Sequence, residues 1–188
     1  MLKINKTLIP KSILRMKKIG ATLIILFTFN FFSYAQLALP LAPMHNLEWH
    51  SSLQEVHELS KATHKPIFAF FTGSDWCGWC KKLQRDVFAK PEFVEWASKN
   101  VILLELDFPR TKQLPPDLAQ QNSGMQQALK VTGYPTCWIL FTAKDEATNN
   151  FNLAPVGSLG YPQGAEIGNE QIKFLNDANK IMSTIKQN

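Results

Sequence analysis

The sequence predicts an α/β fold in which a mixed central sheet carries helices on both faces. Residues 66–72, 101–107 and 136–142 are apolar at nearly every position, which is typical of strands buried on both sides. The segments around them repeat their apolar residues with a helical period. The predicted order is helix, strand, helix, strand, helix, strand, strand, helix, with an extra short helix after the second one. A mixed sheet covered on both faces accommodates that order.

Residues 1–35 have the pattern of a secretory signal peptide. Basic residues precede an apolar run from Ile19 to Phe32, and Ser33-Tyr34-Ala35 places small residues where a signal peptidase requires them. We therefore expect a mature chain that begins at Gln36. Met16-Lys17-Lys18 would serve equally well as the start of this leader. The alternative is an uncleaved N-terminal anchor, although the apolar run is short for a membrane span.

The positive charge of the chain belongs to this leader. The chain has a formal net charge of +5, and its first 35 residues hold six basic residues and no acidic one, which leaves −1 for the remainder. A slightly acidic remainder gives no reason to expect nucleic-acid binding. After the leader we expect an irregular Leu- and Pro-rich arm at 36–47 and one folded domain at 48–188.

Capping signals and periodicity set the boundaries inside this domain. Ser52-Leu53-Gln54-Glu55 is a capping-box pattern, Pro91 suits the first turn of a short helix, and Asn169 can cap a last helix. The expected helices are 52–63, 77–89, one from 91, one within 117–131 and one from 169. The expected strands are 66–72, 101–107, 136–142 and 151–159, with a polar turn at 143–150.

The chemistry of the chain centres on Trp76-Cys77-Gly78-Trp79-Cys80-Lys81-Lys82. The two cysteines lie where a buried strand is followed by a helical pattern. The free N–H groups and the macrodipole of a helix N-terminus favour negative charge, so the pKa of the Cys77 thiol should be lowered and Cys77 should be the nucleophile. Cys80, one turn into the helix, can then attack a mixed disulfide formed at Cys77.

A second landmark lies about 55 residues further along. Gly133-Tyr134-Pro135-Thr136 precedes the apolar run 137–141, and X–Pro bonds are the only peptide bonds that are commonly cis. We expect Tyr134–Pro135 to be cis, because that turn would bring the backbone before the strand next to Cys77.

The two landmarks together resemble the thioredoxin superfamily, over about residues 47–186. Thr72-Gly73-Ser74-Asp75 and Leu106-Asp107-Phe108-Pro109-Arg110 are more similar to secreted bacterial thioredoxin-like proteins than to cytosolic thioredoxin. The resemblance implies a periplasmic or secreted, monomeric thiol–disulfide oxidoreductase that reduces protein disulfides without an organic cofactor or a metal. Electrons would come from an upstream protein dithiol. The implied catalytic residues are Cys77 and Cys80, and the implied substrate-binding residues are Trp76, Trp79, Tyr134 and Pro135.

One departure from the family pattern concerns the base that assists the second cysteine. Family members have a buried aspartate six residues before the first cysteine, where this chain has Phe71, and the lysine that pairs with that aspartate corresponds to Leu103. We interpret both replacements as one change, because a lone buried charge is costly. The candidates for assisting Cys80 are then Asp75, Glu105 and water.

Plainer interpretations of the same residues remain open. In one alternative the cysteine pair is half of a zinc site, although the sequence holds no second pair; in another it forms a structural disulfide. We expect Cys137 to pack in the core, or else to serve as a regulatory thiol. His45, His50, His57 and His64 are expected on solvated surface.

Two other functions also remain open. The first is that of a net disulfide oxidase or isomerase, and the second is that of a binding module whose cysteines form a static disulfide.

Overall fold

The computed structural model describes residues 47–185, which form a five-stranded sheet with helices on both faces. The leader 1–35 and all of the arm except Leu47 therefore lie outside the described residues. The strands are β1 (Trp49–His50), β2 (Ile67–Thr72), β3 (Ile102–Asp107), β4 (Thr136–Asp145) and β5 (Asn150–Leu159). The helices are α2 (Leu53–Thr63), α3 (Gly78–Leu83) with the π-helical turn η1 (Gln84–Phe88), α4 (Pro91–Asn100), α5 (Pro116–Ala128) and α6 (Glu170–Ile185).

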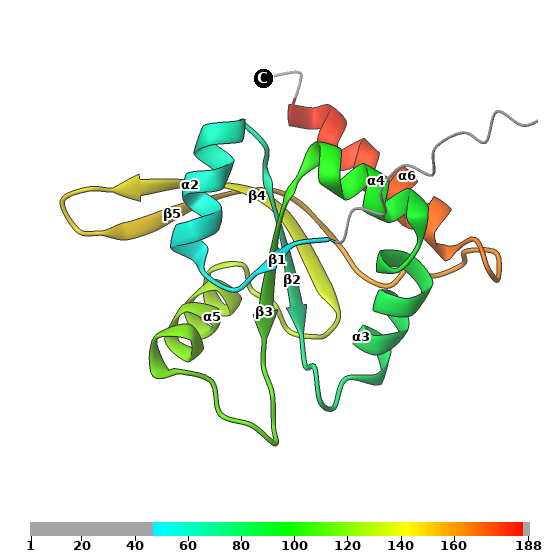
Figure 1. The fold of residues 1–188 in the computed structure, drawn as a ribbon, viewed down its shortest axis with the longest axis horizontal. Helices are drawn as coiled ribbons and strands as arrows, with labels where there is room; N and C mark the ends of the chain where they lie inside the picture. Colours follow the sequence, from blue (N-terminus) through cyan, green and yellow to red (C-terminus); the bar gives the residue numbers. More distant parts are fainter. Residues whose placement is uncertain (1–46, 186–188) are drawn as a thin grey trace, which may run out of the picture. The chain divides into compact units, whose positions relative to one another are not determined.

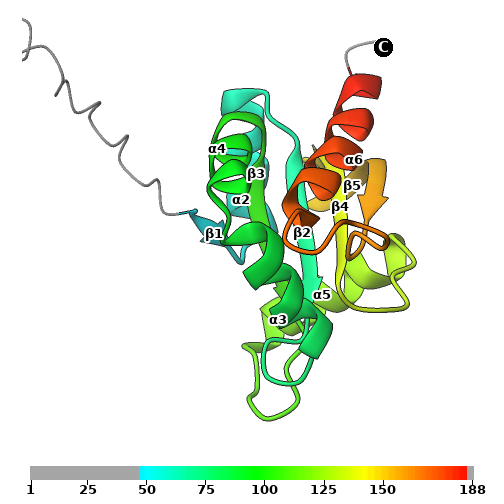
Figure 2. The ribbon, with the colours of Figure 1, turned by 90° about the vertical axis from the view of Figure 1, so that its right-hand side faces the viewer.

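The sheet is mixed, as the sequence predicted. Its strand order is β1-β3-β2-β4-β5; β1 and β2 pair with β3 in parallel, and β4 pairs with β2 and β5 in antiparallel fashion. Figures 1 and 2 show α2 and α5 on one face and α3, α4 and α6 on the other. In residues 47–185, no helix is long and apolar enough to cross a membrane.

The edges of the sheet differ from the prediction. Strand β1 was not predicted, because two residues are too short to show an alternating pattern. Strands β4 and β5 extend into the segment 143–150, which was predicted to be a turn. Most of the outer positions of this hairpin are partly or fully exposed, so polar residues are compatible with strand there and the composition misled the prediction.

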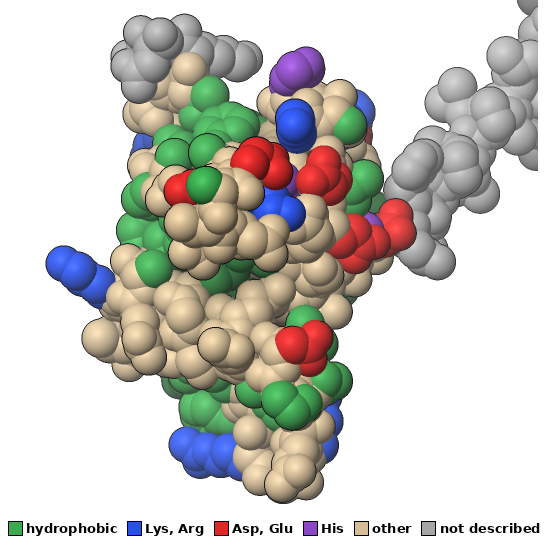
Figure 3. Space-filling model, turned by 90° about the vertical axis from the view of Figure 1, so that its left-hand side faces the viewer, with side chains coloured by type: hydrophobic (Ala, Val, Ile, Leu, Met, Phe, Trp, Pro, Cys, Tyr) green, Lys and Arg blue, Asp and Glu red, His purple; other side chains and the backbone are tan. Residues whose placement is uncertain are grey.

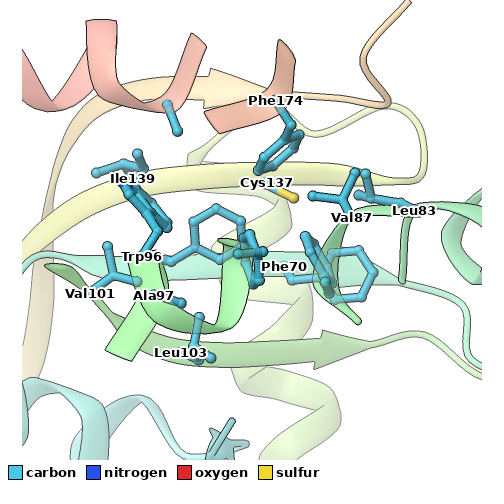
Figure 4. Packing of buried hydrophobic residues seen from close by; sticks show 14 of the residues in the cluster. Phe70, Leu83, Val87, Trp96, Ala97, Val101, Leu103, Cys137, Ile139 and Phe174 are labelled. Atoms are coloured by element: carbon cyan, nitrogen blue, oxygen red, sulfur yellow. The ribbon is translucent and has the colours of Figure 1, made fainter. Parts of the chain in front are cut away.

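Aromatic packing dominates the face of the sheet that carries α3, α4 and α6. Phe68 is fully buried and packs edge to face against rings from β1, η1, α4 and α6, namely Trp49, Phe88, Phe93, Trp96 and Phe174. In Figure 4 the Cys137 sulfur points toward Val87 and Phe174 within this core. The prediction that Cys137 packs in the core is confirmed, since it is completely buried.

The strand registers bring four loops to one edge of the sheet. Thr72 at the end of β2 pairs with Asp107 at the end of β3, and Phe71 pairs with Thr136 at the start of β4. Cys137 in turn pairs with Leu159 at the end of β5. The loops after β2, β3 and β5 and the loop before β4 therefore meet at this edge, which contains both sequence landmarks.

Candidate active site

Cys77 occupies the N-cap of α3, where the sequence placed it. Its backbone is extended, with φ −79° and ψ 98°, and its sulfur accepts a hydrogen bond from the Cys80 backbone N–H at 3.1 Å. The two sulfurs form a disulfide with an S–S distance of 2.04 Å. In this oxidised state both cysteines are buried against the aromatic core. When the disulfide is reduced, the same N–H and the helix N-terminus stabilise a thiolate at Cys77.

The proline landmark lies beside the disulfide. Tyr134–Pro135 is the one cis peptide bond within residues 47–185, and this prediction is confirmed. The Tyr134 ring meets the Trp76 ring edge to face at 5.7 Å, and the Tyr134 hydroxyl accepts a hydrogen bond from Gln126 Nε2. Both landmarks are thus joined by a direct aromatic contact, although 57 positions separate Cys77 from Tyr134 in the sequence.

Gly73 leaves the space that Trp76 occupies. A Cβ atom at Gly73 would lie 2.4 Å from the Trp76 indole, so only glycine allows this ring to fold back on the loop. The indole Nε1 donates a hydrogen bond to the Phe108 carbonyl at 2.8 Å. Trp76 is therefore fixed between its own loop and the loop after β3.

Two aspartates, one from each of these two loops, accept hydrogen bonds from the other loop. Asp107, at the end of β3, accepts hydrogen bonds from the Ser74 backbone N–H and hydroxyl at 2.8 and 2.7 Å. Asp75 accepts hydrogen bonds from the backbone N–H groups of Arg110 and Thr111 and from the Thr111 hydroxyl. We call this set of contacts the loop clamp. The two segments that suggested secreted relatives in the sequence are its two halves.

The loop clamp removes Asp75 as a base for Cys80. Its hydrogen bonds, first of all those from the Thr111 hydroxyl and backbone N–H, lower the pKa of the Asp75 carboxyl to about 2. Such a group is a weak proton acceptor near neutral pH, and its oxygens are directed to residues 110 and 111.

The sequence comparison placed Phe71 and Leu103 where the family has the buried pair that assists the second cysteine, and for Phe71 this placement is wrong. Successive side chains of a strand point to opposite faces, and Phe71 packs with Leu106 in the core under α2 and α5, whereas Cys80 and Leu103 belong to the other core. Phe71 is therefore not a neighbour of Cys80. Phe70 occupies the cysteine face instead, and it pairs in register with Glu105 on β3.

Glu105 lines a cavity of about 400 Å³ on this cysteine face. The other lining residues include Phe70, Ser74 and Gln84, the last of which lies one helical turn after Cys80. Burial raises the pKa of the Glu105 carboxyl, and the nearby Asp107 charge raises it further, while Lys112 opposes them. Glu105 is thus a partly buried carboxyl with solvent beside it.

Trp79 lies between the two cysteines in the first turn of α3. Its side chain is 54% exposed, and the centroid of its ring lies 5.2 Å from that of Tyr161. Tyr161 follows β5 and donates a hydrogen bond from its hydroxyl to Asp86, which also forms an ion pair with Lys82. No sequence pattern indicated Tyr161, because its contacts with Trp79 and Asp86 require the distant end of β5 to reach α3 and η1.

The remaining cysteine and the histidines have structural positions. Burial raises the pKa of the Cys137 thiol well above its ordinary value, so this thiol is a poor nucleophile. His57 is buried and bonds Thr142 Oγ1 at 2.8 Å, contrary to the expected solvated surface. His50 lies 3.1 Å from Glu55, and His45 is outside the described residues. Within 47–185 no group of three or more potential ligands could hold a metal.

A model of thioredoxin-like proteins matches residues 48–142, about half of the chain. The chain belongs to the thioredoxin-like family. It is similar to the disulfide bond reductase DsbH of Chlamydia pneumoniae, with 37% identity over 116 residues that make up 62% of this chain and 69% of that protein. It is also similar to the thioredoxin-related protein DsbJ of the same organism, with 27% identity over 65% of this chain and 34% of that protein.

A solved structure of a DsbH oxidoreductase has a similar fold. Its TM-score is 0.62 at 29% identity, and the match covers 84% of this chain and 98% of that one. This match confirms the predicted thioredoxin-like α/β fold. With the Cys77–Cys80 disulfide at the start of α3, the relatives identify this thioredoxin-like protein as a thiol–disulfide oxidoreductase.

The pKa of Asp75 provides a test of the loop clamp. The carboxyl should titrate near pH 2 in the folded protein, and Thr111→Val should raise its pKa toward the ordinary value of 3.8 by removing the hydroxyl donor. Because the folded pKa is the lower one, the stabilisation by Asp75 is complete above about pH 4 and is lost as the pH falls toward 2. Carboxyl NMR titration measures both values. An Asp75 pKa near 3.8 in the unmodified protein would contradict the clamp.

Proposed function

We propose that this protein reduces disulfides of other proteins outside the cytoplasm, with Cys77 and Cys80 as its catalytic pair. The observation that supports it most directly is the position of Cys77, which is both the N-cap of α3 and a partner in the disulfide with Cys80. The leader pattern of residues 1–35 supports export with cleavage before Gln36. We further propose that the mature enzyme is a monomer. The related DsbH is named a disulfide bond reductase, which agrees with the proposed direction.

In the proposed reaction the reduced enzyme begins with a thiolate at Cys77. This thiolate attacks one sulfur of the substrate disulfide, so that a mixed disulfide forms and the first substrate thiolate leaves. The Cys80 thiol then loses its proton and attacks the Cys77 sulfur, which releases the second substrate thiolate and forms the Cys77–Cys80 disulfide. An upstream protein dithiol returns two electrons and two protons to the pair, and no organic cofactor takes part.

The groove for the substrate is proposed to lie between the two aromatic contacts around Cys77. Trp76 and Tyr134 form one of them, and the exposed Trp79 offers an apolar surface on the other side. The backbone of Tyr134, immediately before Pro135 and β4, would pair with an extended segment of the substrate. Pro135 shapes this end of the groove.

The reduction potential tests the direction of electron flow. Gly78 and Trp79 add no cationic or hydrogen-bonding imidazole beside the Cys77 sulfur, and Lys82 is paired with Asp86, so the helix terminus is left as the main source of thiolate stabilisation. Cys80 is buried within the apolar core on its face of the sheet, and these surroundings disfavour its thiolate. We expect a potential on the order of −270 to −200 mV, between thioredoxin and the disulfide isomerases.

Equilibration against glutathione buffers, followed by the fluorescence of Trp76 and Trp79, measures this potential. A reduction potential of about −120 mV would be that of a dedicated oxidase and would favour the oxidase alternative.

The two cysteines should react differently with alkylating agents. In the reduced protein Cys77 should be labelled by iodoacetamide much faster than Cys80 or Cys137 at mildly acidic pH, because its thiolate is stabilised at the helix terminus. Mass spectrometry of proteolytic peptides identifies the labelled thiol. Cys80→Ser should accumulate mixed disulfides with substrate and Cys77→Ser should not. Faster labelling of Cys80 would reverse the two roles.

We propose that Glu105 accepts the Cys80 proton through the solvent of its cavity. Glu105→Gln should slow the release of the second substrate thiol by about 100-fold, the lower end of the range for general-base catalysis, and should change the pH dependence of that step. Rapid mixing of the Cys77 mixed disulfide with detection of the released thiol measures it, and the exposed Glu95→Gln on α4 is the matched control. An unchanged pH profile in Glu105→Gln would assign proton removal to bulk water instead.

A further inference from the structure

Arg110 is an exposed cation placed over the face of Trp76. Its guanidinium carbon lies 3.8 Å from the centroid of the Trp76 ring, and Trp76 immediately precedes Cys77. Within residues 47–185 its guanidinium forms no ion pair, whereas neighbouring cations do. Lys112 lies 3.1 Å from Asp107, and Lys82 and Arg85 both pair with Asp86.

Backbone hydrogen bonds of the loop that contains Arg110, rather than an ion pair of its guanidinium, hold this residue in place. Asp75 accepts the Arg110 backbone N–H at 3.0 Å, and the Phe108 carbonyl two residues earlier accepts the Trp76 indole N–H. The loop clamp thus holds the guanidinium against the indole and leaves its N–H groups without a carboxylate partner in the described chain. A restrained planar guanidinium loses less entropy when it binds a carboxylate, which it can grip with two parallel hydrogen bonds.

The proposed groove around Cys77 therefore has a cation on one side and an aromatic pair on the other. Arg110 lies in the loop after β3, while the Trp79–Tyr161 pair lies on the side of β5, and β2 and β4 separate these strands in the sheet. Lys and Arg side chains gather at the lower end of the molecule in Figure 3, at the level of the loop after β3 in Figure 1. By contrast, α5 above them has one charged residue, Asp117.

We propose that Arg110 binds a substrate carboxylate next to the disulfide under attack, so that the enzyme prefers protein disulfides flanked by Asp or Glu. This inference rests on the proposed function. An acidic residue of the extended substrate segment reaches the guanidinium over Trp76 while its neighbouring cysteine meets Cys77. Arg110 is a specificity-determining residue in this account and takes no part in bond making.

Symmetric peptide dimers test this preference, because both sulfurs of their disulfide are equivalent. Three dimers of a single-cysteine peptide are compared, with Gln on both sides of the cysteine, with Glu before it, or with Glu after it. One of the two Glu dimers should have a kcat/KM about two- to fivefold above that of the Gln dimer, the range expected for an exposed ion pair. The preference should shrink as salt is added.

Variants separate the roles of the neighbouring cations. Arg110→Gln should remove the preference, while Lys112→Gln, which loses the same charge two residues away, should retain most of it. Equal rates for all three dimers with the unmodified enzyme, or a preference that persists in Arg110→Gln, would overturn the inference. An equal slowing of all dimers in Arg110→Gln would also overturn it, because the cation would then act on the Cys77 thiolate. No turnover of any dimer would refute the proposed function itself.

Discussion

The complete burial of β2 is the constraint on which the site depends. All six residues of this strand are buried, because α2 and α5 cover one face and α3, α4 and α6 cover the other. A strand held this firmly ends at a fixed point, and residues 73–77 then lead from its end into α3. Cys77 is therefore placed at a helix N-terminus by the packing of residues that have no chemistry of their own. Substitutions deep in the aromatic core can consequently alter reactivity by moving the end of β2.

Most of this arrangement could be predicted from local patterns. The buried strands, the helix after Cys77 and the cis bond before Pro135 each have a signal within a few residues of sequence, and the structure contains all of them. These features are local because burial on both faces and the restriction of proline do not depend on distant partners. The candidate site was predictable to the same extent, as far as Cys77, Cys80 and their flanking tryptophans.

The rest depended on register and on contacts between distant segments. Phe71 was assigned to the wrong face because counting back from Cys77 cannot reveal how the loop 73–76 shifts the alternation of the strand. Asp75 looked like a possible base until its three donors across the loop clamp were known. No pattern indicated Tyr161, and Arg110 was singled out only as the end of a family-like segment, because the contacts of each depend on a strand that ends beside the end of β2. His57 was misjudged because a partner 85 residues away buries it.

The buried third thiol has a consequence for how this protein matures. Three cysteines allow three possible pairings, and two of them involve Cys137, which the fold keeps as a buried free thiol. Closing the short loop between Cys77 and Cys80 has the smallest entropy cost, but an unfolded chain still exposes Cys137 to other thiols and disulfides. Pairing of β4 with β2 and β5 withdraws that thiol into the core. Assembly of the centre of the sheet thus separates Cys137 from the thiols and disulfides that an unfolded chain would meet.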